Sequence, residues 1–328
     1  MSRIRVGVVG VGRLGQHHAR IYEELPSTEL VGVADSDYPR AVKIARLYNT
    51  QPFSDFRPLL GRVDAVSIAV PTVTHFAIAR EFLEQGVHVL VEKPITATVQ
   101  EARELVDLAQ AHQRVLQVGH VERFNAAVVR LREIVQDPAF IEVHRLGPYD
   151  PRVQDIGVVL DLMIHDIDII LEVVKAPVES IDAVGVAIFS DKEDIANARI
   201  HFANGCIANI TASRITPKKT RKIRFFQEDT YISIDYVKPA MEIYRKQVVD
   251  PPAPGAPPIE IVRKRVRLKV QEPLKAELQH FTECVERGIT PQVTGEKARD
   301  ALALAVEISE MIKRNGRFPR PVGAAVSL

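Results

Sequence analysis

An acidic and a basic side chain stand four positions apart in an otherwise apolar segment. Asp161 and His165 lie in GVVLDLMIHDIDIILEVV, residues 157–174, which has the length and composition of a buried helix. Charged groups are seldom buried unless they are paired or used, and positions i and i+4 share a helix face. Because an imidazole titrates near neutrality, this pair could accept a proton and orient a hydroxyl. The alternative is a structural aspartate beside a hydrogen-bonded core histidine.

A lysine follows a predicted strand where parallel sheets usually bind ligands. Lys93 lies in VHVLVEKPI, between Glu92 and Pro94. Ligands of open parallel sheets bind outside the carboxyl ends of the strands, so we expect Lys93 to point at a cofactor cleft. The Lys-Pro bond could be cis, which would fix the turn. Taken alone, a lysine at a strand end is more often a solvated surface group.

Three glycines precede the first predicted helix in the pattern Gly10-x-Gly12-x-x-Gly15. They directly follow the strand IRVGVVG, and the helix GQHHARIYEEL begins at the last of them. Such glycines allow a tight turn, close approach of a pyrophosphate and close packing of helix on strand. The helix N-terminus adds free N–H groups and the positive end of a dipole. This context predicts a dinucleotide-binding loop.

Asp35 ends the second predicted strand, 20 residues after the last of the glycines. A carboxylate at this position binds a ribose 2′-hydroxyl and repels a 2′-phosphate. The sequence therefore favours NAD over NADP. The small Ser36 and the nearby Arg40 keep the other cofactor open.

The predicted elements divide the chain into two domains. In residues 1–120, short Val/Ile/Leu-rich strands alternate with helices, which indicates an α/β, Rossmann-type, doubly wound parallel sheet. In residues 121–328, a helix, a strand and the helix of residues 157–174 precede a succession of strands. We expect a substrate-binding and oligomerisation domain here, of α+β class with an open, mostly antiparallel sheet. Asn204-Gly205 predicts a tight hairpin turn. Two terminal helices could pack back on the first domain.

Composition narrows the partners. The 328 residues carry 43 Lys and Arg against 42 Asp and Glu, so no long-range field favours nucleic acid or an anionic membrane. Cys206 and Cys284 are expected to be reduced thiols in a cytoplasmic protein. We expect no metal site, because no Cys/His cluster occurs. We also expect no signal peptide, because MSRIRVGVVGVG runs directly into a strand, and no bilayer-spanning segment.

The motifs together resemble a known family. The glycine loop, AVPTVTHFAIAREFLEQGVHVLVEKPI and the Asp-x-x-x-His helix occur in the order seen in the glucose–fructose oxidoreductase and inositol dehydrogenase family of NAD(P)-dependent sugar dehydrogenases. The likeness covers essentially the whole chain. It implies that Lys93 contacts the substrate hydroxyl and the nicotinamide, and that Asp161 and His165 complete the catalytic site. Whether Lys93 or His165 is the general base stays open.

The resemblance also implies a set of contacts with NAD. The segment from Pro71 to His75 corresponds to a loop of the family, commonly Thr-Pro-Asn-x-x-His, that borders the nicotinamide ribose. Here Val70 precedes the proline and Thr72 stands at the Asn position, which is a departure from the family pattern. The expected cofactor-binding residues are Gly10, Gly12, Arg13, Leu14, Gly15, Asp35, Pro71, Thr72, His75, Glu92, Lys93 and Gln117.

Three further segments are similar to one subgroup of this family: VGHVERFNAAVVRLREI, IEVHRLGPYDPR and DIGVVLDLMIHDIDI. That subgroup oxidises the 3-hydroxyl of UDP-N-acetylglucosamine before a transaminase installs an amino group for lipid A. Forked guanidinium donors suit a diphosphate, so Arg123, Arg145 and Arg152 are candidate ligands, each with a structural role as the alternative. The expected substrate-binding residues are Lys93, Arg123, Asn125, Arg145, Asp161 and His165.

Other functions remain compatible with the same motifs. The substrate could be a UDP-uronic acid, inositol or another polyol, or the enzyme could reduce a ketosugar or a tetrapyrrole-like molecule. A non-catalytic NAD-binding regulator on the same fold is a further alternative, against which the three polar residues together argue. Because a large exposed sheet face is usually covered by a partner, we expect a homodimer or homotetramer.

Overall fold

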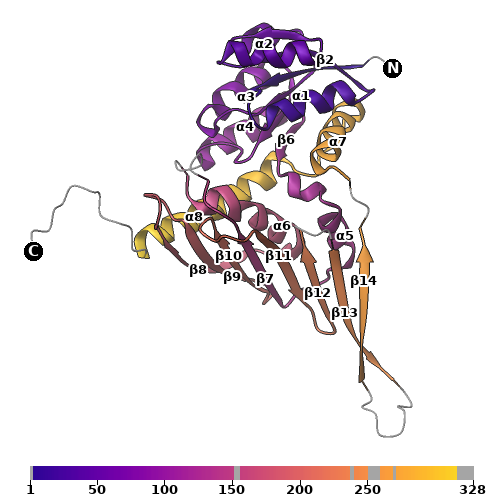
Figure 1. Ribbon diagram of the computed structural model, residues 1–328, viewed down its shortest axis with the longest axis vertical. Coiled ribbons are helices and arrows are strands. Elements are labelled where there is room, and N and C mark those ends of the chain that lie inside the picture. Colours follow the sequence, from indigo (N-terminus) through magenta and orange to yellow (C-terminus); the bar gives the residue numbers. More distant parts are fainter. Residues whose placement is uncertain (1–2, 151–155, 237–239, 250–258, 269–270, 316–328) are drawn as a thin grey trace, which may run out of the picture. The chain divides into compact units, whose positions relative to one another are not determined.

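The computed structural model describes residues 3–150, 156–236, 240–249, 259–268 and 271–315. The chain divides into two compact units (Figure 1). The first unit comprises Met1–Phe124 and Gln271–Ala303, and the second comprises Asn125–Val270 and Leu304–Leu328. A segment from the C-terminal part of the chain thus belongs to the first unit.

The first unit contains a six-stranded parallel sheet in the order β3-β2-β1-β4-β5-β6. This is the strand order of doubly wound dinucleotide-binding folds, which confirms the predicted fold class. The strands are β1 (Ile4–Val9), β2 (Thr28–Ala34), β3 (Gln51–Phe53), β4 (Ala65–Ile68), β5 (His88–Glu92) and β6 (Leu116–Gly119). Every residue of β4 and β6 is buried, as expected for strands covered on both faces.

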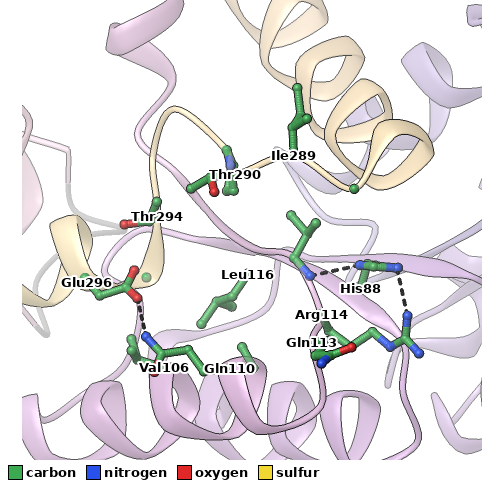
Figure 2. A pocket seen from close by; sticks show the side chains of 15 residues that line it. His88, Val106, Gln110, Gln113, Arg114, Leu116, Ile289, Thr290, Thr294 and Glu296 are labelled. Carbon is green, nitrogen blue, oxygen red and sulfur yellow. Dashed lines mark hydrogen bonds between the residues drawn. The ribbon is translucent and has the colours of Figure 1, made fainter.

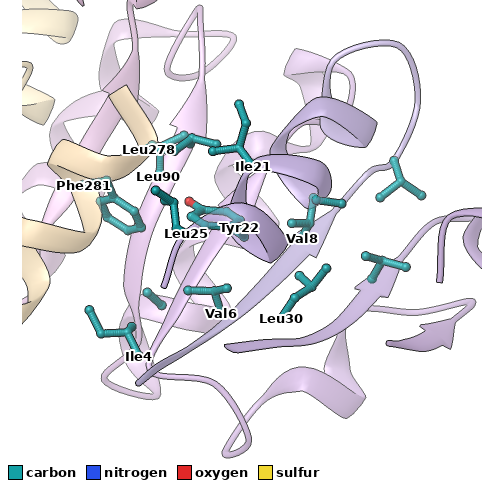
Figure 3. Close-up of a cluster of buried hydrophobic side chains, with 14 of the residues drawn as sticks. Ile4, Val6, Val8, Ile21, Tyr22, Leu25, Leu30, Leu90, Leu278 and Phe281 are labelled. Atoms are coloured by element: carbon teal, nitrogen blue, oxygen red, sulfur yellow. The ribbon is translucent and has the colours of Figure 1, made fainter. Parts of the chain in front are cut away.

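Helices α1 and α7 complete the core of this unit on one face of the sheet (Figure 3). Leu278 and Phe281 of α7 pack in the same cluster as Ile21 and Tyr22 of α1, over Val6 of the central strand β1. The helices of the unit are α1 (Gly15–Glu24), α2 (Tyr38–Leu47), α3 (His75–Glu84), α4 (Val99–Ala111) and α7 (Pro273–Arg287), with the short turns η1 (Arg57–Leu59), η2 (Thr72–Thr74) and η3 (Val121–Phe124). Helix α3 packs against α4, β4 and β5.

The second unit contains an eight-stranded sheet in the order β14-β13-β12-β11-β7-β10-β9-β8. Neighbouring strands are antiparallel except β7 and β10, which confirms the predicted open, mostly antiparallel sheet. The strands are β7 (Phe140–Leu146), β8 (Val178–Val186), β9 (Ile195–Phe202), β10 (Ile207–Ser213), β11 (Thr220–Phe226), β12 (Thr230–Asp235), β13 (Ala240–Val248) and β14 (Ile259–Arg267). Gly205 has φ +84° and forms the predicted hairpin turn between β9 and β10.

Two helices of the second unit lie before and after β7 in the chain. They are α5 (Ala126–Ile134) and α6 (Ile164–Val174), and a π-helical segment, Val159–Met163, leads directly into α6. The π segment contacts β10. Helix α8 (Gly295–Asn315) contributes residues to both units. The helix predicted over residues 157–174 is therefore present, but its first turn is wider than that of an α-helix.

Candidate functional site

The loop after β1 has three glycines. A side chain at two of them would collide with the main chain, whereas a side chain at the third would not. A Cβ on Gly10, whose φ is +82°, would lie 2.4 Å from the carbonyl oxygen of Ala69, and a Cβ on Gly15 would lie 1.8 Å from that of Gly10. A Cβ on Gly12 would meet nothing nearer than an Arg40 nitrogen at 4.0 Å. The first and third glycines therefore shape the turn, whereas the second leaves room for a ligand. This cradle at the start of α1 fits a pyrophosphate.

Asp35 directly follows β2, and main-chain groups hold its carboxylate in place. The Oδ2 atom accepts a hydrogen bond from the backbone N–H of Val11 at 2.9 Å, and Oδ1 accepts one from that of Asp37 at 2.9 Å. The guanidinium of Arg40 approaches both oxygens, at 3.2 and 3.3 Å. Only 7% of Asp35 is exposed. The carboxylate is therefore fixed beside the glycine loop, and its predicted contact with ribose hydroxyls stays a prediction.

A cavity of about 480 Å³ lies at this edge of the first unit's sheet. Four predicted cofactor residues line it: Gly10, Gly12, Asp35 and Pro71. The cavity also has two apolar walls that sequence reasoning missed, Phe56 and Ile78. No spacing rule singles them out, because one follows the short edge strand β3 and the other lies in mid-helix. Arg13 and Leu14 lie exposed on the glycine loop, and Thr72 is half-buried in η2.

The turn after β5 carries the predicted catalytic lysine. The Lys93–Pro94 bond is cis, as the sequence suggested, and Lys93 is half-buried. The carboxylate of Glu92 lies 3.2 Å from Nε2 of the buried His18, and it accepts a 3.3 Å hydrogen bond from the Lys93 backbone N–H. A Cβ on Gly119 would come within 2.8 Å of that carboxylate. Glu92 is thus a buried support for the turn.

His75 joins two of the loops at this sheet edge. It is 1% exposed, and its Nδ1 and Nε2 each lie 2.9 Å from a carbonyl oxygen, of Pro94 and Val70 respectively. Burial lowers the pKa of His75, although the two carbonyls and the charge of Glu92 oppose this effect. With both ring nitrogens facing main-chain carbonyls, His75 connects the loop after β4 to the turn after β5.

Gln117 lies in the interior of the first unit. It is fully buried in β6, and its Nε2 donates to the carbonyl oxygen of Glu277 in α7 at 3.3 Å. Its backbone also forms an isolated bridge with Thr294. These contacts connect the last strand of the parallel sheet to the C-terminal segment of the unit.

Asp161 and His165 lie at the start of the helical segment of the second unit. Asp161 lies within the π segment, His165 lies in the first turn of α6, and both are half-buried. π-Helical turns are rare and occur frequently at functional sites. Lys93 belongs to the first unit, so the convergence of these three residues in one site stays a prediction.

Glu193 holds the beginning of the π segment. Its backbone carbonyl accepts from the N–H of Val158 at 2.9 Å, and its Oε1 accepts from that of Val159 at 3.4 Å. A Cβ on Gly157 would lie 1.9 Å from the same Oε1, so a side chain at this position would displace the carboxylate. Sequence analysis did not identify Glu193, which lies 34 residues after Val159 in the chain.

The predicted diphosphate ligands are mostly buried. Arg145 is 2% exposed, and its Nε and Nη2 donate to the carboxylate of Asp166 at 2.6 and 2.8 Å. Arg123 is 1% exposed. Asn125 is the N-cap of α5, and its Oδ1 accepts from the N–H of Ala127 at 3.0 Å. Arg152 lies outside the described residues. A diphosphate would therefore have to compete with Asp166 for Arg145.

A second cavity, of about 380 Å³, opens at the opposite edge of the first unit's sheet (Figure 2). It is lined at the amino ends of β5 and β6 by His88 and Leu116, and at the start of α8 by Glu296. The His88 Nδ1 accepts from the backbone N–H of Val115 at 2.9 Å. Burial, and then the charge of Arg114, lower the pKa of His88 to about 4. The predicted cofactor residues do not line this cavity.

Neither a metal-binding cluster nor a membrane-spanning helix is found in the part of the chain that the structure describes. Within it, no group of three or more His, Cys, Asp or Glu side chains is arranged to hold a metal ion. None of the helices there is both long enough and apolar enough to cross a bilayer. Cys206 and Cys284 are free thiols, and burial raises the pKa of each to about 11.

Two family models match consecutive parts of the sequence. Residues 4–120 match the model described as "Oxidoreductase family, NAD-binding Rossmann fold", and residues 128–233 match "GFO/IDH/MocA C-terminal domain". The first range covers the parallel sheet and its glycine loop, and the second includes Asp161 and His165.

Named relatives match the chain over nearly its whole length. The UDP-N-acetylglucosamine 3-dehydrogenase of Acidithiobacillus ferrooxidans is 37% identical over 94% of this chain and 97% of its own. A solved structure of that dehydrogenase superposes with a TM-score of 0.89, at 36% identity, over 96% of this chain and 99% of the other. The scyllo-inositol 2-dehydrogenase (NAD(+)) of Bacillus subtilis is 27% identical over 96% of this chain and 95% of its own.

Proposed function

The chain belongs to the GFO/IDH/MocA family of NAD-binding oxidoreductases, and from this premise we propose that it oxidises the 3-hydroxyl of UDP-N-acetylglucosamine to a 3-keto sugar. One observation carries the choice of substrate: the 37% identity to a UDP-N-acetylglucosamine 3-dehydrogenase, which spans 97% of that relative. The inositol dehydrogenase of comparable coverage is 27% identical, so a free polyol is the weaker candidate.

The first unit supplies the proposed cofactor site. The backbone at Gly12 and the start of α1 receive the pyrophosphate, and the carboxylate of Asp35 receives the hydroxyls of the adenosine ribose. Phe56 and Ile78 offer apolar walls to the adenine. When bound, NAD supplies the carbon that accepts the hydride. His75 holds the loops of Pro71 and Lys93 at the nicotinamide end.

Lys93, His165 and Asp161 carry the proposed proton chemistry. As the hydride leaves C3 of the sugar, the proton of the 3-hydroxyl passes to His165 or to Lys93. If the histidine is the base, the Lys93 ammonium stabilises the developing carbonyl as a hydrogen-bond donor. Asp161 orients the hydroxyl or the imidazole. The elements proposed to form the site carry two groups that can accept this proton. They are the imidazole of His165 and the amine of Lys93.

The proposed surroundings of the reaction follow from its product. A 3-keto sugar nucleotide is a substrate for a transaminase, and a 3-amino sugar is a precursor of lipid A-type lipids, so we propose a place in that synthesis. Two buried free thiols suit the cytoplasm.

We further propose a homodimer or homotetramer, because exposed apolar side chains line both edge strands of the large sheet: Val184, Val186, Ile259, Ile261 and Val262. Light scattering after size exclusion tests this assembly, and a monomer would contradict it.

The experiment for the proposed function is anaerobic mixing of the protein with NAD⁺ and candidate sugars, followed by absorbance of NADH. We expect NADH with UDP-N-acetylglucosamine and none with N-acetylglucosamine lacking UDP. A signal only with inositol or with a UDP-uronic acid would overturn the substrate and keep the chemistry. Tight NAD⁺ binding without NADH from any of these sugars, with or without a transaminase to remove the product, would favour the non-catalytic regulator.

A further inference from the structure

The cavity at the end of β2 contains one basic side chain among its lining residues. Arg40, at the start of α2, faces a lining that also includes the acidic Asp35 and Asp55. Asp55 is engaged by Arg57, whose Nη1 lies 3.0 Å from Oδ2. The charge that a cofactor meets beside Asp35 is therefore set chiefly by Arg40 and the carboxylates that it contacts.

Arg40 bridges two carboxylates. Its Nη1 lies 3.2 Å from Asp35 Oδ1, and its Nη2 lies 2.8 Å from Asp37 Oδ2. The Asp35 side chain is 6% exposed and fixed by two backbone N–H groups, whereas the Arg40 side chain is 45% exposed. The guanidinium is thus the partner that can turn, and the carboxylate is the partner that stays.

The Arg40 guanidinium lies near two parts of the proposed adenosine site, the glycine loop and Asp35. Its Nη1 is the atom nearest to a Cβ built on Gly12, at 4.0 Å, so Arg40 lies over the glycine loop as well as beside Asp35. The neighbouring Ser36 is small and exposed. A forked, permanently charged donor beside a small residue is the arrangement that receives a ribose 2′-phosphate.

We propose that Arg40 is a specificity-determining residue that opposes Asp35 in the choice between NAD and NADP. This inference rests on the proposed use of NAD in this cavity. Asp35 repels a 2′-phosphate, and Arg40 partly cancels this repulsion by neutralising the carboxylate and by turning toward the phosphate. The protein therefore prefers NAD⁺ but binds NADP⁺ measurably, and the preference depends on both residues.

The test is calorimetric titration of NAD⁺ and NADP⁺ into the wild type, Arg40→Ala, Asp35→Ser and the double variant. Because each charge-assisted hydrogen bond is worth roughly tenfold in affinity, Arg40→Ala should weaken NADP⁺ binding about tenfold. It should change NAD⁺ binding much less. Asp35→Ser should weaken NAD⁺ and tighten NADP⁺ binding, and the double variant should lose that gain. Arg46→Ala removes an exposed arginine from the same helix outside the cavity and should change neither affinity.

Two results would overturn the proposal: unchanged NADP⁺ affinity in Arg40→Ala, or equal NADP⁺ affinity in Asp35→Ser and the double variant. Arg40→Ala keeps both backbone contacts of Asp35, so it decides the matter even if Asp35→Ser fails to fold. A wild type that binds neither cofactor would overturn the proposed cofactor site together with this inference. Binding of NAD⁺ without oxidation of any sugar would contradict only the proposed substrate, and the comparison of variants would still decide the role of Arg40.

Discussion

In the first unit, main-chain groups hold the candidate cofactor residues, whereas in the second unit buried charged side chains hold the elements that carry Asp161 and His165. Backbone N–H groups fix the Asp35 carboxylate, and backbone carbonyls face both nitrogens of His75. In the second unit, Asp166 of α6 pairs with Arg145 of β7, and Glu193 holds the start of the π segment.

This difference explains why the sequence predicts the candidate cofactor residues of the first unit better than the candidate substrate residues of the second. A main-chain site requires glycines, a proline and strand ends at fixed spacings, and these are visible as motifs. A site supported by ion pairs uses the same arginines and aspartates that could bind a ligand. The sequence alone therefore does not distinguish a charged residue of the second unit that supports the fold from one that contacts a substrate.

The largest effect is expected from the proposed catalytic residues. Replacing Lys93 or His165 by Ala should lower turnover by about a hundredfold to ten-thousandfold, the usual contribution of a positioned acid or base. The affinity for NAD⁺ should change little, because the glycine loop and Asp35 are intact. Lys43→Ala, at an exposed position of α2, is the matched control. Near-normal turnover in both variants would refute the assignment of these residues.

The glycine loop offers a sharper test within the first unit. Gly15→Ala places a Cβ against the carbonyl of Gly10 and should lower both the melting temperature and the affinity for NAD⁺. Gly12→Ala meets open space in the protein, so it should melt like the wild type and still weaken NAD⁺ binding by about tenfold or more. Gly147→Ala, at another open position, should change neither. Equal NAD⁺ affinity in Gly12→Ala and the wild type would remove the pyrophosphate from this loop.

Breaking a buried pair should cost the second unit more than breaking an exposed one. Arg214 donates to Asp194 at 2.8 Å, with side chains 4% and 0% exposed. Asp194→Ala leaves the guanidinium buried without its carboxylate, which should lower the free energy of unfolding by about 3–5 kcal/mol. Glu133→Ala, which breaks the exposed pair with Arg130, should cost less than about 1 kcal/mol. Denaturant unfolding measures both, and equal losses would contradict the description of this unit.

The same aspartate makes the second unit sensitive to acid. Burial alone would raise the pKa of Asp194, but the N–H groups of Ile188 and Phe189 and the side chain of Arg214 hold it at about 2, below the ordinary 3.8. A depressed carboxyl pKa stabilises the fold above pH 4, and this contribution disappears as the pH falls through about 2. Stability should therefore drop between these values in the wild type and less steeply in Asp194→Asn. Parallel pH profiles for the two proteins would contradict this role.

The smallest effect is expected from His88 in the first unit. Its pKa of about 4 lies below the ordinary 6.5, so the folded state prefers the neutral ring, whose Nδ1 accepts the Val115 N–H. The contribution is complete above pH 6.5 and is lost as the pH falls through 4. The protection factors of the β5 and β6 amides, which correct for the pH dependence of intrinsic exchange, should fall over this range in the wild type. In His88→Asn, the protection factors should be lower at neutral pH, and they should not show this fall between pH 6.5 and 4.

Much of the fold was predictable, because it follows from local patterns. Apolar runs between helical segments predicted the parallel sheet, and Asn204-Gly205 predicted a hairpin that the structure confirms with a positive φ at Gly205. The cis bond after Lys93 was also anticipated. Each of these features depends on residues that are neighbours in the chain.

The parts that escaped prediction depend on residues distant in sequence. The residues next to Arg145 in the chain do not predict its pairing with Asp166. Likewise, the residues around His75 do not predict that the carbonyls of Pro94 and Val70 face its ring. The π turn at Val159–Met163 is invisible to a pattern that counts i and i+4, and Glu193, which contacts its first residue, lies far along the chain. Long-range partners of polar groups are set by the assembled fold rather than by spacing.

The central claim is that the hydride leaves C3 of UDP-N-acetylglucosamine for NAD⁺ bound at the glycine loop. The most direct measurement uses the sugar nucleotide labelled with deuterium at C3 and analyses the cofactor by mass spectrometry and NMR after one turnover. We expect the label at C4 of the nicotinamide in the reduced cofactor and a ketone at C3 of the sugar. Reduced cofactor without deuterium, or a ketone at another carbon, would contradict the claim.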